Sequence, residues 1–158
     1  MATLTTPFAS FTRPADTTAY ASGDLVANST TAGSVVPMTF IIRPENRPAM
    51  IRRVRIKKTG TSIANASFRL HLYGTSAITN TNGDNGAWLT NNTANYYGSI
   101  DVTLDKAFSD GSQGVGSPSA GSEMNYDIGL CYGLLEARNA YTPASAEVFT
   151  VELELIAL

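Results

Sequence analysis

Residues that could do chemistry are scarce in this chain. Its 158 residues include one cysteine, one histidine and one tryptophan, which are Cys131, His71 and Trp88. The thirteen acidic residues are scattered, and none of them has the spacing of an acid–base pair or of a metal site. The sequence therefore predicts a protein that is not an enzyme, with no catalytic residues, no metal ligands and no cofactor.

The single histidine is the first candidate for a catalytic or metal-binding group. His71 falls in the outward-facing set of a predicted strand, between Arg69 and Tyr73, with no second histidine in the chain. An imidazole that acts as a base or a ligand needs other groups to orient it, and no carboxylate pair is near it in the sequence. We therefore interpret His71 as a residue of the sandwich face or of a subunit contact.

Two glycine-containing segments match ligand-binding loops in composition alone. Asp84-Asn85-Gly86 lacks the regular acidic spacing and the terminal glutamate of a calcium loop, and turn formation explains its Asn-Gly pair. The glycines at 111, 114 and 116 are followed by no basic residue and no helix that could hold phosphate. Residues 109–122 are therefore predicted to form a flexible surface loop.

Positive charge is concentrated in one stretch. Seven of the eleven Lys and Arg residues lie between positions 43 and 58. Alternation along a strand places Arg53, Arg55 and Lys57 in one row and turns Arg52 elsewhere. Aromatic residues do not alternate with these cations as they do in single-strand nucleic acid sites. We expect the row to pair with acids of this chain or of another subunit, and we expect no nucleic acid partner.

Acids with a matching spacing occur in the last segment of the chain. Glu152 and Glu154 lie on the face opposite Val151, Leu153 and Leu155. Two outward rows of opposite charge would align if their strands were antiparallel neighbours, and such pairs contribute about 0.2–1 kcal/mol each. We therefore predict that the final strand lies beside the basic strand in one sheet.

The elements that position these residues are short strands. Alternation of apolar and polar residues predicts strands over 50–58, 67–73, 98–104, 124–130 and 148–158. Further strand-like runs cover 20–27 and 35–43, and no segment keeps a helical period over three turns. About eight strands with uneven loops predict an all-β chain folded as a single antiparallel jelly-roll sandwich. An immunoglobulin-like sandwich is the alternative, although its Cys–Trp–Cys framework is absent.

The N-terminal segment differs from the rest in composition. Residues 3–12 alternate weakly and contain Pro7, which suits an extended arm or an edge strand. The turn at Arg13-Pro14 follows it. We therefore divide the chain into an N-terminal arm or edge strand, residues 1–12, and a β-sandwich domain, residues 13–158.

The bulk properties exclude several classes of partner. The net charge of −2 and the isoelectric point near 5.3 produce no general attraction to nucleic acid or to an anionic membrane. No run approaches the roughly 20 apolar residues of a spanning helix, and the first residues do not match a secretory signal. A lone Cys131 is expected to be a small buried apolar residue. We expect no membrane partner.

Two stretches together resemble a known family. The first is Phe-Thr-Arg-Pro-Ala-Asp-Thr-Thr-Ala-Tyr at 11–20, followed by Gly-Asp-Leu-Val at 23–26. The second is Leu-His-Leu-Tyr at 70–73, then a polar loop, Asp-Asn-Gly-Ala-Trp at 84–88 and Tyr-Gly-Ser-Ile at 97–100. This order resembles the capsid decoration, or cement, proteins of tailed bacteriophages. The loop between Tyr73 and Asp84 departs from the expected pattern because it has no proline.

The resemblance implies a structural virion protein on the capsid exterior. Such proteins are similar to jelly rolls that sit as homotrimers on the shell, bind the major capsid protein and stabilise contacts between its subunits. An extended edge can add backbone hydrogen bonds to another sheet, so we expect the N-terminal segment to contact the capsid or a neighbour through Thr3, Leu4, Phe8, Phe11 and Arg13. We expect subunit contacts at Arg43, Arg47 and His71.

A second class of function remains open at this point. Jelly rolls also occur as carbohydrate-binding or tail-fibre modules, which present aromatic platforms to glycans. Trp88, Tyr96 and Tyr97 lie around one long loop and would form such a platform. A small β-sandwich enzyme is the third class, and the sequence offers no residue for its catalytic site.

Overall fold

The computed structural model describes residues 4–42, 48–60, 65–78, 82–89, 93–120, 125–126 and 129–158. Strands dominate this part of the chain, and every pair of neighbouring strands is antiparallel. One turn of 3-10 helix covers Ala32–Ser34. Among the described residues, no helix is long and apolar enough to cross a membrane.

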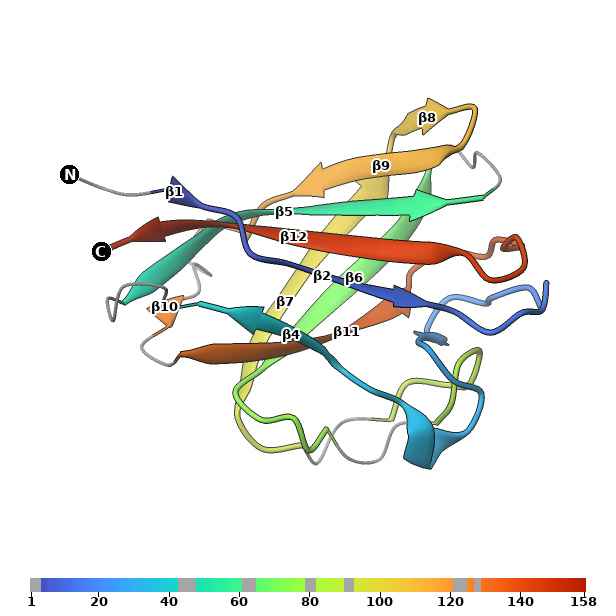
Figure 1. Cartoon of the computed structure of the whole chain (residues 1–158), viewed down its shortest axis with the longest axis horizontal. Coiled ribbons are helices and arrows are strands. Elements are labelled where there is room, and N and C mark those ends of the chain that lie inside the picture. The colour runs from blue at the N-terminus through green and yellow to red at the C-terminus, as the bar shows by residue number, and fades with distance from the viewer. Residues whose placement is uncertain are drawn as a thin grey trace.

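The strands form two sheets, which we call sheet I and sheet II. Sheet I contains β1 (Leu4–Thr5), β2 (Phe8–Thr12), β12 (Val148–Ala157), β5 (Ala49–Thr59), β9 (Gly111–Gly116), β8 (Lys106–Phe108) and β10 (Asn125–Tyr126). Sheet II contains β3 (Leu25–Val26), β4 (Met38–Ile41), β11 (Leu130–Ala137), β6 (Ala66–Tyr73) and β7 (Tyr96–Leu104). The strands of sheet II lie behind those of sheet I and cross them obliquely (Figure 1).

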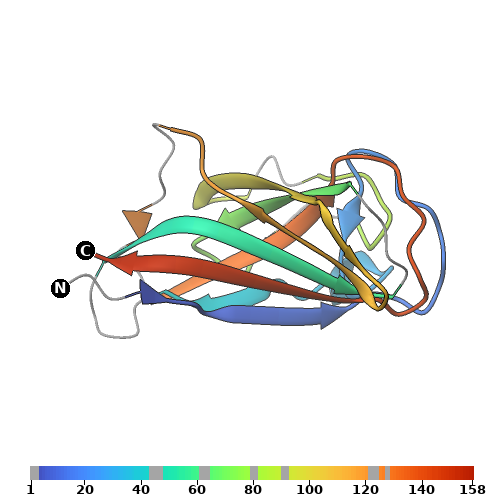
Figure 2. The same cartoon turned by 90° about the horizontal axis from the view of Figure 1, so that it is seen from above.

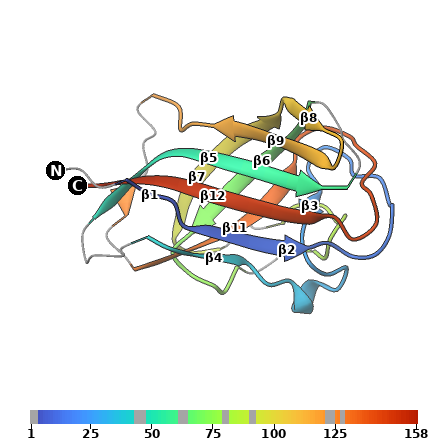
Figure 3. The same ribbon diagram turned by 45° about the horizontal axis from the view of Figure 1, so that its top comes forward.

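The order of the strands defines the fold. Sheet I runs β2-β12-β5-β9 and sheet II runs β4-β11-β6-β7. The first of these eight strands, β2, pairs with the last, β12, and the second, β4, pairs with the seventh, β11. The two strands that follow in the chain, β5 and β6, lie in opposite sheets. This is the wrapping of a jelly roll. The predicted all-β jelly-roll sandwich is therefore confirmed, and Figure 3 shows β9, β5, β12 and β2 side by side.

The core lies between the sheets. It is built from the residues at every second position of each strand, whose side chains point inward. Phe149, Val151, Leu153 and Leu155 of β12 are all fully buried. Phe68 of β6 packs edge-on against Phe149, with ring centroids 5.4 Å apart. Burial of each such side chain contributes about 1.5–3 kcal/mol. Cys131 is also fully buried, as its isolation in the sequence predicted.

The prediction that β5 and β12 are neighbours is confirmed. The two strands pair antiparallel, with Glu152 opposite Arg55 and Glu154 opposite Arg53. The carboxylate of Glu154 lies 2.5 Å from Nε of Arg53. Because a slip of one residue would turn these charges into the core, the rows fix the register of the central pair in sheet I.

The predicted loop over 109–122 is wrong for its first half, where β9 forms. Gly114 and Gly116 face sheet II, and a Cβ on either residue would overlap a backbone oxygen of β7, from Thr103 and Asp101 respectively. Glycine weakens an isolated strand, which is why the composition indicated a loop. Here the missing side chains let the backbones of the two sheets come together.

The N-terminal segment forms the edge of sheet I. Leu4 and Thr5 pair with Ile156 and Leu155, and β2 pairs with β12 from Phe8 to Thr12. Residues 4–5 and 8–12 are therefore paired within the sheet of this chain. In the view from above, the loops 13–24 and 138–147 gather at the end of the sandwich that lies opposite the chain termini (Figure 2).

Candidate functional site

The free edge of sheet I presents large apolar side chains to solvent. On its outer side β2 pairs with no strand among the described residues, and Pro7 separates it from β1. Phe8 is 68% exposed, and Leu4 is also exposed. Phe8 points to the outer face of the sheet, opposite Glu152 of β12. Both residues therefore lie where a neighbouring molecule can contact them.

Phe11 does not share this position. It lies on the inner face of β2, where its ring stacks on that of Phe149 with centroids 5.4 Å apart and planes 9° apart. Phe8 and Phe11 are three positions apart in the same strand, and successive side chains alternate between faces, so the two rings point to opposite faces. The sequence-based assignment of Phe11 to a contact surface is corrected to a core role. Thr3 lies outside the described residues.

Arg13 belongs to a buried polar network. Its guanidinium lies 3.2 Å from the Asp84 carboxylate and donates to the hydroxyl of Tyr20 at 2.9 Å. The Tyr20 hydroxyl and the Ala27 amide donate to Asp84. Burial raises the pKa of Asp84, and these donors oppose the rise. Because the Arg13 side chain is fully buried, its assignment to a capsid contact is corrected: it joins the loops at one end of the sandwich.

His71 also proves to be covered. It lies on the outer face of sheet II, where the Trp88 ring stacks on it with centroids 4.2 Å apart. Its Nε2 is 2.7 Å from a carboxylate oxygen of Glu136, and its Nδ1 is 3.1 Å from the Tyr96 hydroxyl. Only 8% of the residue is exposed, so the assignment of His71 to a subunit contact is corrected. Arg43 and Arg47 lie outside the described residues.

The covered histidine predicts a pH dependence of stability. Burial lowers the pKa of His71 below its ordinary value of 6.5, while Glu136 opposes the shift. The unfolded chain therefore binds the proton more readily than the folded chain, and stability falls as the pH drops through about 6.5. The stabilisation is fully present above that value. Urea unfolding should show wild type losing more stability than His71→Gln between about pH 7.5 and about pH 5.5.

The comparison of the two proteins isolates the histidine from the acidic groups near it. Glu136, Arg69 and Asp101 are present in both proteins, so the difference between the two unfolding free energies reports the change at position 71. An unchanged difference across this pH range would contradict the prediction.

A β-bulge concentrates positive charge on the outer face of sheet I. The register places Glu154 opposite Arg53 and Leu155 opposite Ile51, so Arg52 is an extra residue in β5. Arg52 and Arg53 are therefore both exposed, between the buried Ile51 and Val54. The prediction that Arg52 turns away from the basic row is wrong. The break in alternation over 51–54 is the sequence signal that indicates the bulge.

Two carboxylates serve the four cations of this face. Glu154 lies 2.5 Å from Arg53 and 3.6 Å from Arg52. Glu152 lies 2.5 Å from Nζ of Lys57 and 3.7 Å from Arg55. We call the surface formed by Arg52, Arg53, Arg55 and Lys57 the basic face; after pairing, it carries two positive charges in excess.

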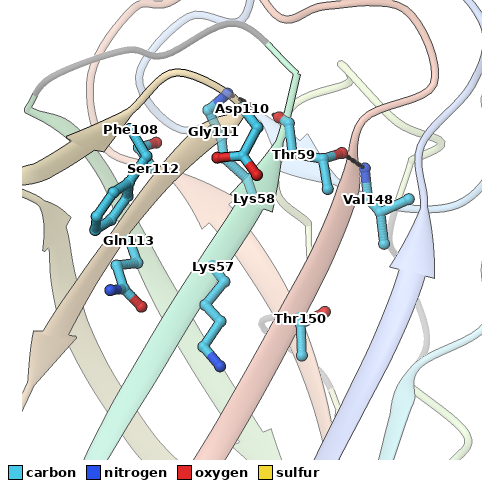
Figure 4. Close-up of a pocket in the computed structure, with 10 residues that line it drawn as sticks. All are labelled: Lys57, Lys58, Thr59, Phe108, Asp110, Gly111, Ser112, Gln113, Val148 and Thr150. Carbon is cyan, nitrogen blue, oxygen red and sulfur yellow. Dashed lines mark hydrogen bonds between the residues drawn. The ribbon is translucent and has the colours of Figure 1, made fainter.

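A shallow depression of about 420 Å³ adjoins the basic face, at the end of sheet I near the β8–β9 turn. Figure 4 shows Phe108 and Asp110 on one side of it and Thr150 across from them. Lys57 reaches Glu152, and Thr150 hydrogen-bonds to Ser10. Among the described residues that line the depression there is no histidine or cysteine. We interpret it as a surface recess.

Two residues of the predicted glycan platform, Trp88 and Tyr96, contact His71 on the outer face of sheet II. Tyr96 is exposed and tilts against Tyr73, with ring centroids 5.1 Å apart. Tyr97 is also exposed, whereas Trp88 is partly buried and has one ring face on His71. Trp88 and Tyr96 therefore both contact His71. The two tyrosines are more exposed to solvent than the tryptophan.

Metal chemistry has no visible basis in the described ranges. Within them, no group of three or more His, Cys, Asp or Glu residues is placed to hold an ion. Asn85 adopts a left-handed backbone with φ of 65°, as in a tight turn, and its amide donates to two backbone carbonyls. The Asp84-Asn85-Gly86 segment is therefore a structural turn whose carboxylate serves Arg13.

The chain matches no known protein family and no curated protein. Among solved structures it is similar to the decameric capsid protein of BFDV, with 12% identity, 100% of both chains covered and a TM-score of 0.35. It is also similar to a VLP structure of the extra small virus of the giant freshwater prawn Macrobrachium rosenbergii. That match has 10% identity and a TM-score of 0.34, and covers 98% of this chain and 79% of the other. Both TM-scores are low, so the jelly-roll assignment stands on the strand order of this chain.

Proposed function

We propose that this chain is a non-enzymatic structural protein of a phage virion that binds the outer surface of the capsid. The observation that carries the proposal is the free edge of sheet I, where Phe8 and Leu4 are exposed beside a closed and fully packed core. The sequence resemblance to decoration proteins supports the same function. The proposed partners are the major capsid protein and two further copies of this chain, as a homotrimer.

The mechanism would be mechanical. An edge strand offers free backbone groups that can extend the sheet of a neighbour, and apolar side chains beside it add buried area. A rigid sandwich attached to two shell subunits raises the free energy required to separate them. Many identical attachments act together, so that a weak single contact still leads to high occupancy through avidity.

Replacing Phe8 tests the role of the edge. Burial of a phenylalanine contributes about 1.5–3 kcal/mol, so Phe8→Ser should weaken binding to undecorated capsids by roughly tenfold or more. The measurement is co-sedimentation of the purified chain with capsids of the phage that encodes it. Light scattering of the free chain reports whether it is a trimer.

The matched control is Phe108→Ser, because Phe108 is 49% exposed and lies on β8, at the opposite edge of sheet I. This variant should bind as wild type does. Equal losses in both variants would show that the edge is not the contact. No binding by the unmodified chain would refute the proposed function.

A carbohydrate-binding module is the second candidate. The observation that favours it is the exposure of Tyr96 and Tyr97, of which Tyr96 contacts His71 on the outer face of sheet II. A glycan array distinguishes the two candidates, because glycan binding that is lost in Tyr96→Ala and retained in Phe8→Ser would favour this second function.

A further inference from the structure

We propose that the basic face of sheet I docks against an acidic protein surface. The inference rests on the proposed function and names the chemistry of the partner: the shell region that receives the chain would carry clustered Asp and Glu side chains.

The β-bulge adds a charge to this face that a regular strand would not place there. In a regular strand Arg52 would point to the side opposite Arg53, where the core lies. The bulge turns both arginines outward, and the side chain of Arg52 is 60% exposed. Bulges re-aim side chains at the cost of a disrupted ladder. This one brings a fourth cation to a face that already holds three.

The internal acids do not neutralise the face. The shorter ion pairs, from Arg53 to Glu154 and from Lys57 to Glu152, align β5 with β12. Among the described residues, the ion pairs of Arg52 and Arg55 are the longer ones, of 3.6 and 3.7 Å, with the same two carboxylates. These two arginines therefore keep most of their capacity for charge-assisted hydrogen bonds with a partner.

The flanks of the face favour a protein over a nucleic acid. One row across the sheet reads Phe8, Glu152, Arg55 and Val115, from β2 through β12 and β5 to β9. Phe8 and Val115 are exposed apolar residues at its two ends. A carboxylate within the row would repel a phosphate backbone, whereas an interface between proteins commonly combines apolar anchors with complementary charge.

The test measures binding of the labelled chain to undecorated capsids at low and high salt, from about 0.05 M to about 0.5 M NaCl. The double variant Arg52→Gln with Arg55→Gln removes the two weakly paired charges and keeps most of their apolar stems. It should bind roughly tenfold more weakly than wild type at low salt, with a flatter salt dependence. Thermal unfolding should show that it remains folded, since exposed pairs contribute little to stability.

The matched control is Lys106→Gln on β8. Its side chain is 63% exposed and lies 2.7 Å from Asp105, which balances its charge. This control should bind within roughly twofold of wild type. Unchanged affinity in the double variant, with wild type still bound to capsids, would overturn the inference and leave the proposed function standing.

Two further outcomes are informative. Absence of capsid binding by wild type would overturn the proposed function and, with it, this inference. Labelled duplex DNA is the second probe, under the same salt conditions. Binding to DNA that is tighter than binding to capsids, and that is lost in the double variant, would overturn the assignment of an acidic protein in favour of a nucleic acid.

Discussion

Replacing Asp84 with alanine is expected to lower the free energy of unfolding by about 3–5 kcal/mol. The carboxylate accepts hydrogen bonds from the Tyr20 hydroxyl and the Ala27 amide, and it pairs with the fully buried guanidinium of Arg13. Its removal leaves that guanidinium without its buried partner, and Asp16 at the surface is the one carboxylate that still contacts it among the described residues. The loss of the buried ion pair and of the acceptor shared by the Tyr20 hydroxyl and the Ala27 amide accounts for the large effect.

Urea unfolding of the variant beside Asp101→Ala measures this loss. Asp101 pairs with Arg69 at 2.6 Å, but its side chain is 53% exposed, so its removal should cost about 0.2–1 kcal/mol. If Asp84→Ala does not fold, Asp84→Asn keeps two acceptor sites and should show an intermediate loss. Equal losses for Asp84→Asn and Asp101→Ala would contradict the role of the buried network.

Gly114→Ala is expected to lower the free energy of unfolding by about 3 kcal/mol. The new Cβ would overlap the carbonyl oxygen of Thr103 and lie 2.7 Å from its carbon, and both atoms belong to the backbone of β7. A flexible side chain could move aside, whereas a paired strand cannot. The two sheets must therefore separate at this point, which disturbs the packing on both sides of it.

Thermal and urea unfolding beside Gly33→Ala test this expectation. No atom lies within 4 Å of a Cβ at Gly33, so the control should change stability by less than about 0.5 kcal/mol. Loss of folded protein in the Gly114 variant alone would agree with the prediction. Similar stability of the two variants would show that β9 is held less closely to β7 than the structure indicates.

Much of the sandwich follows from local pattern. The alternation of Phe149, Val151, Leu153 and Leu155 is a property of an extended backbone, so it predicts a strand with one buried face wherever that strand lies. The matching charges of β5 and β12 predicted their pairing, because an outward row of positive charges is stabilised beside a strand that carries negative charges at the same spacing. The same alternation places Phe8 and Phe11 on opposite faces of β2, although it does not predict which of them faces the core.

Several of the errors share a long-range cause. The glycines of β9 looked like a loop because the contact that requires them comes from β7, which the local sequence does not reveal. Arg13 and His71 looked accessible because their coverings, the Asp84 turn and Trp88, come from a distant segment. The sequence by itself determined the alternating strands β5, β6 and β12, their buried faces and the pairing of the charged rows, since these depend on period and charge. It did not indicate β9 or the central strand β11. The tertiary structure alone decided which outward residues stay exposed, because exposure depends on what the rest of the chain places over them.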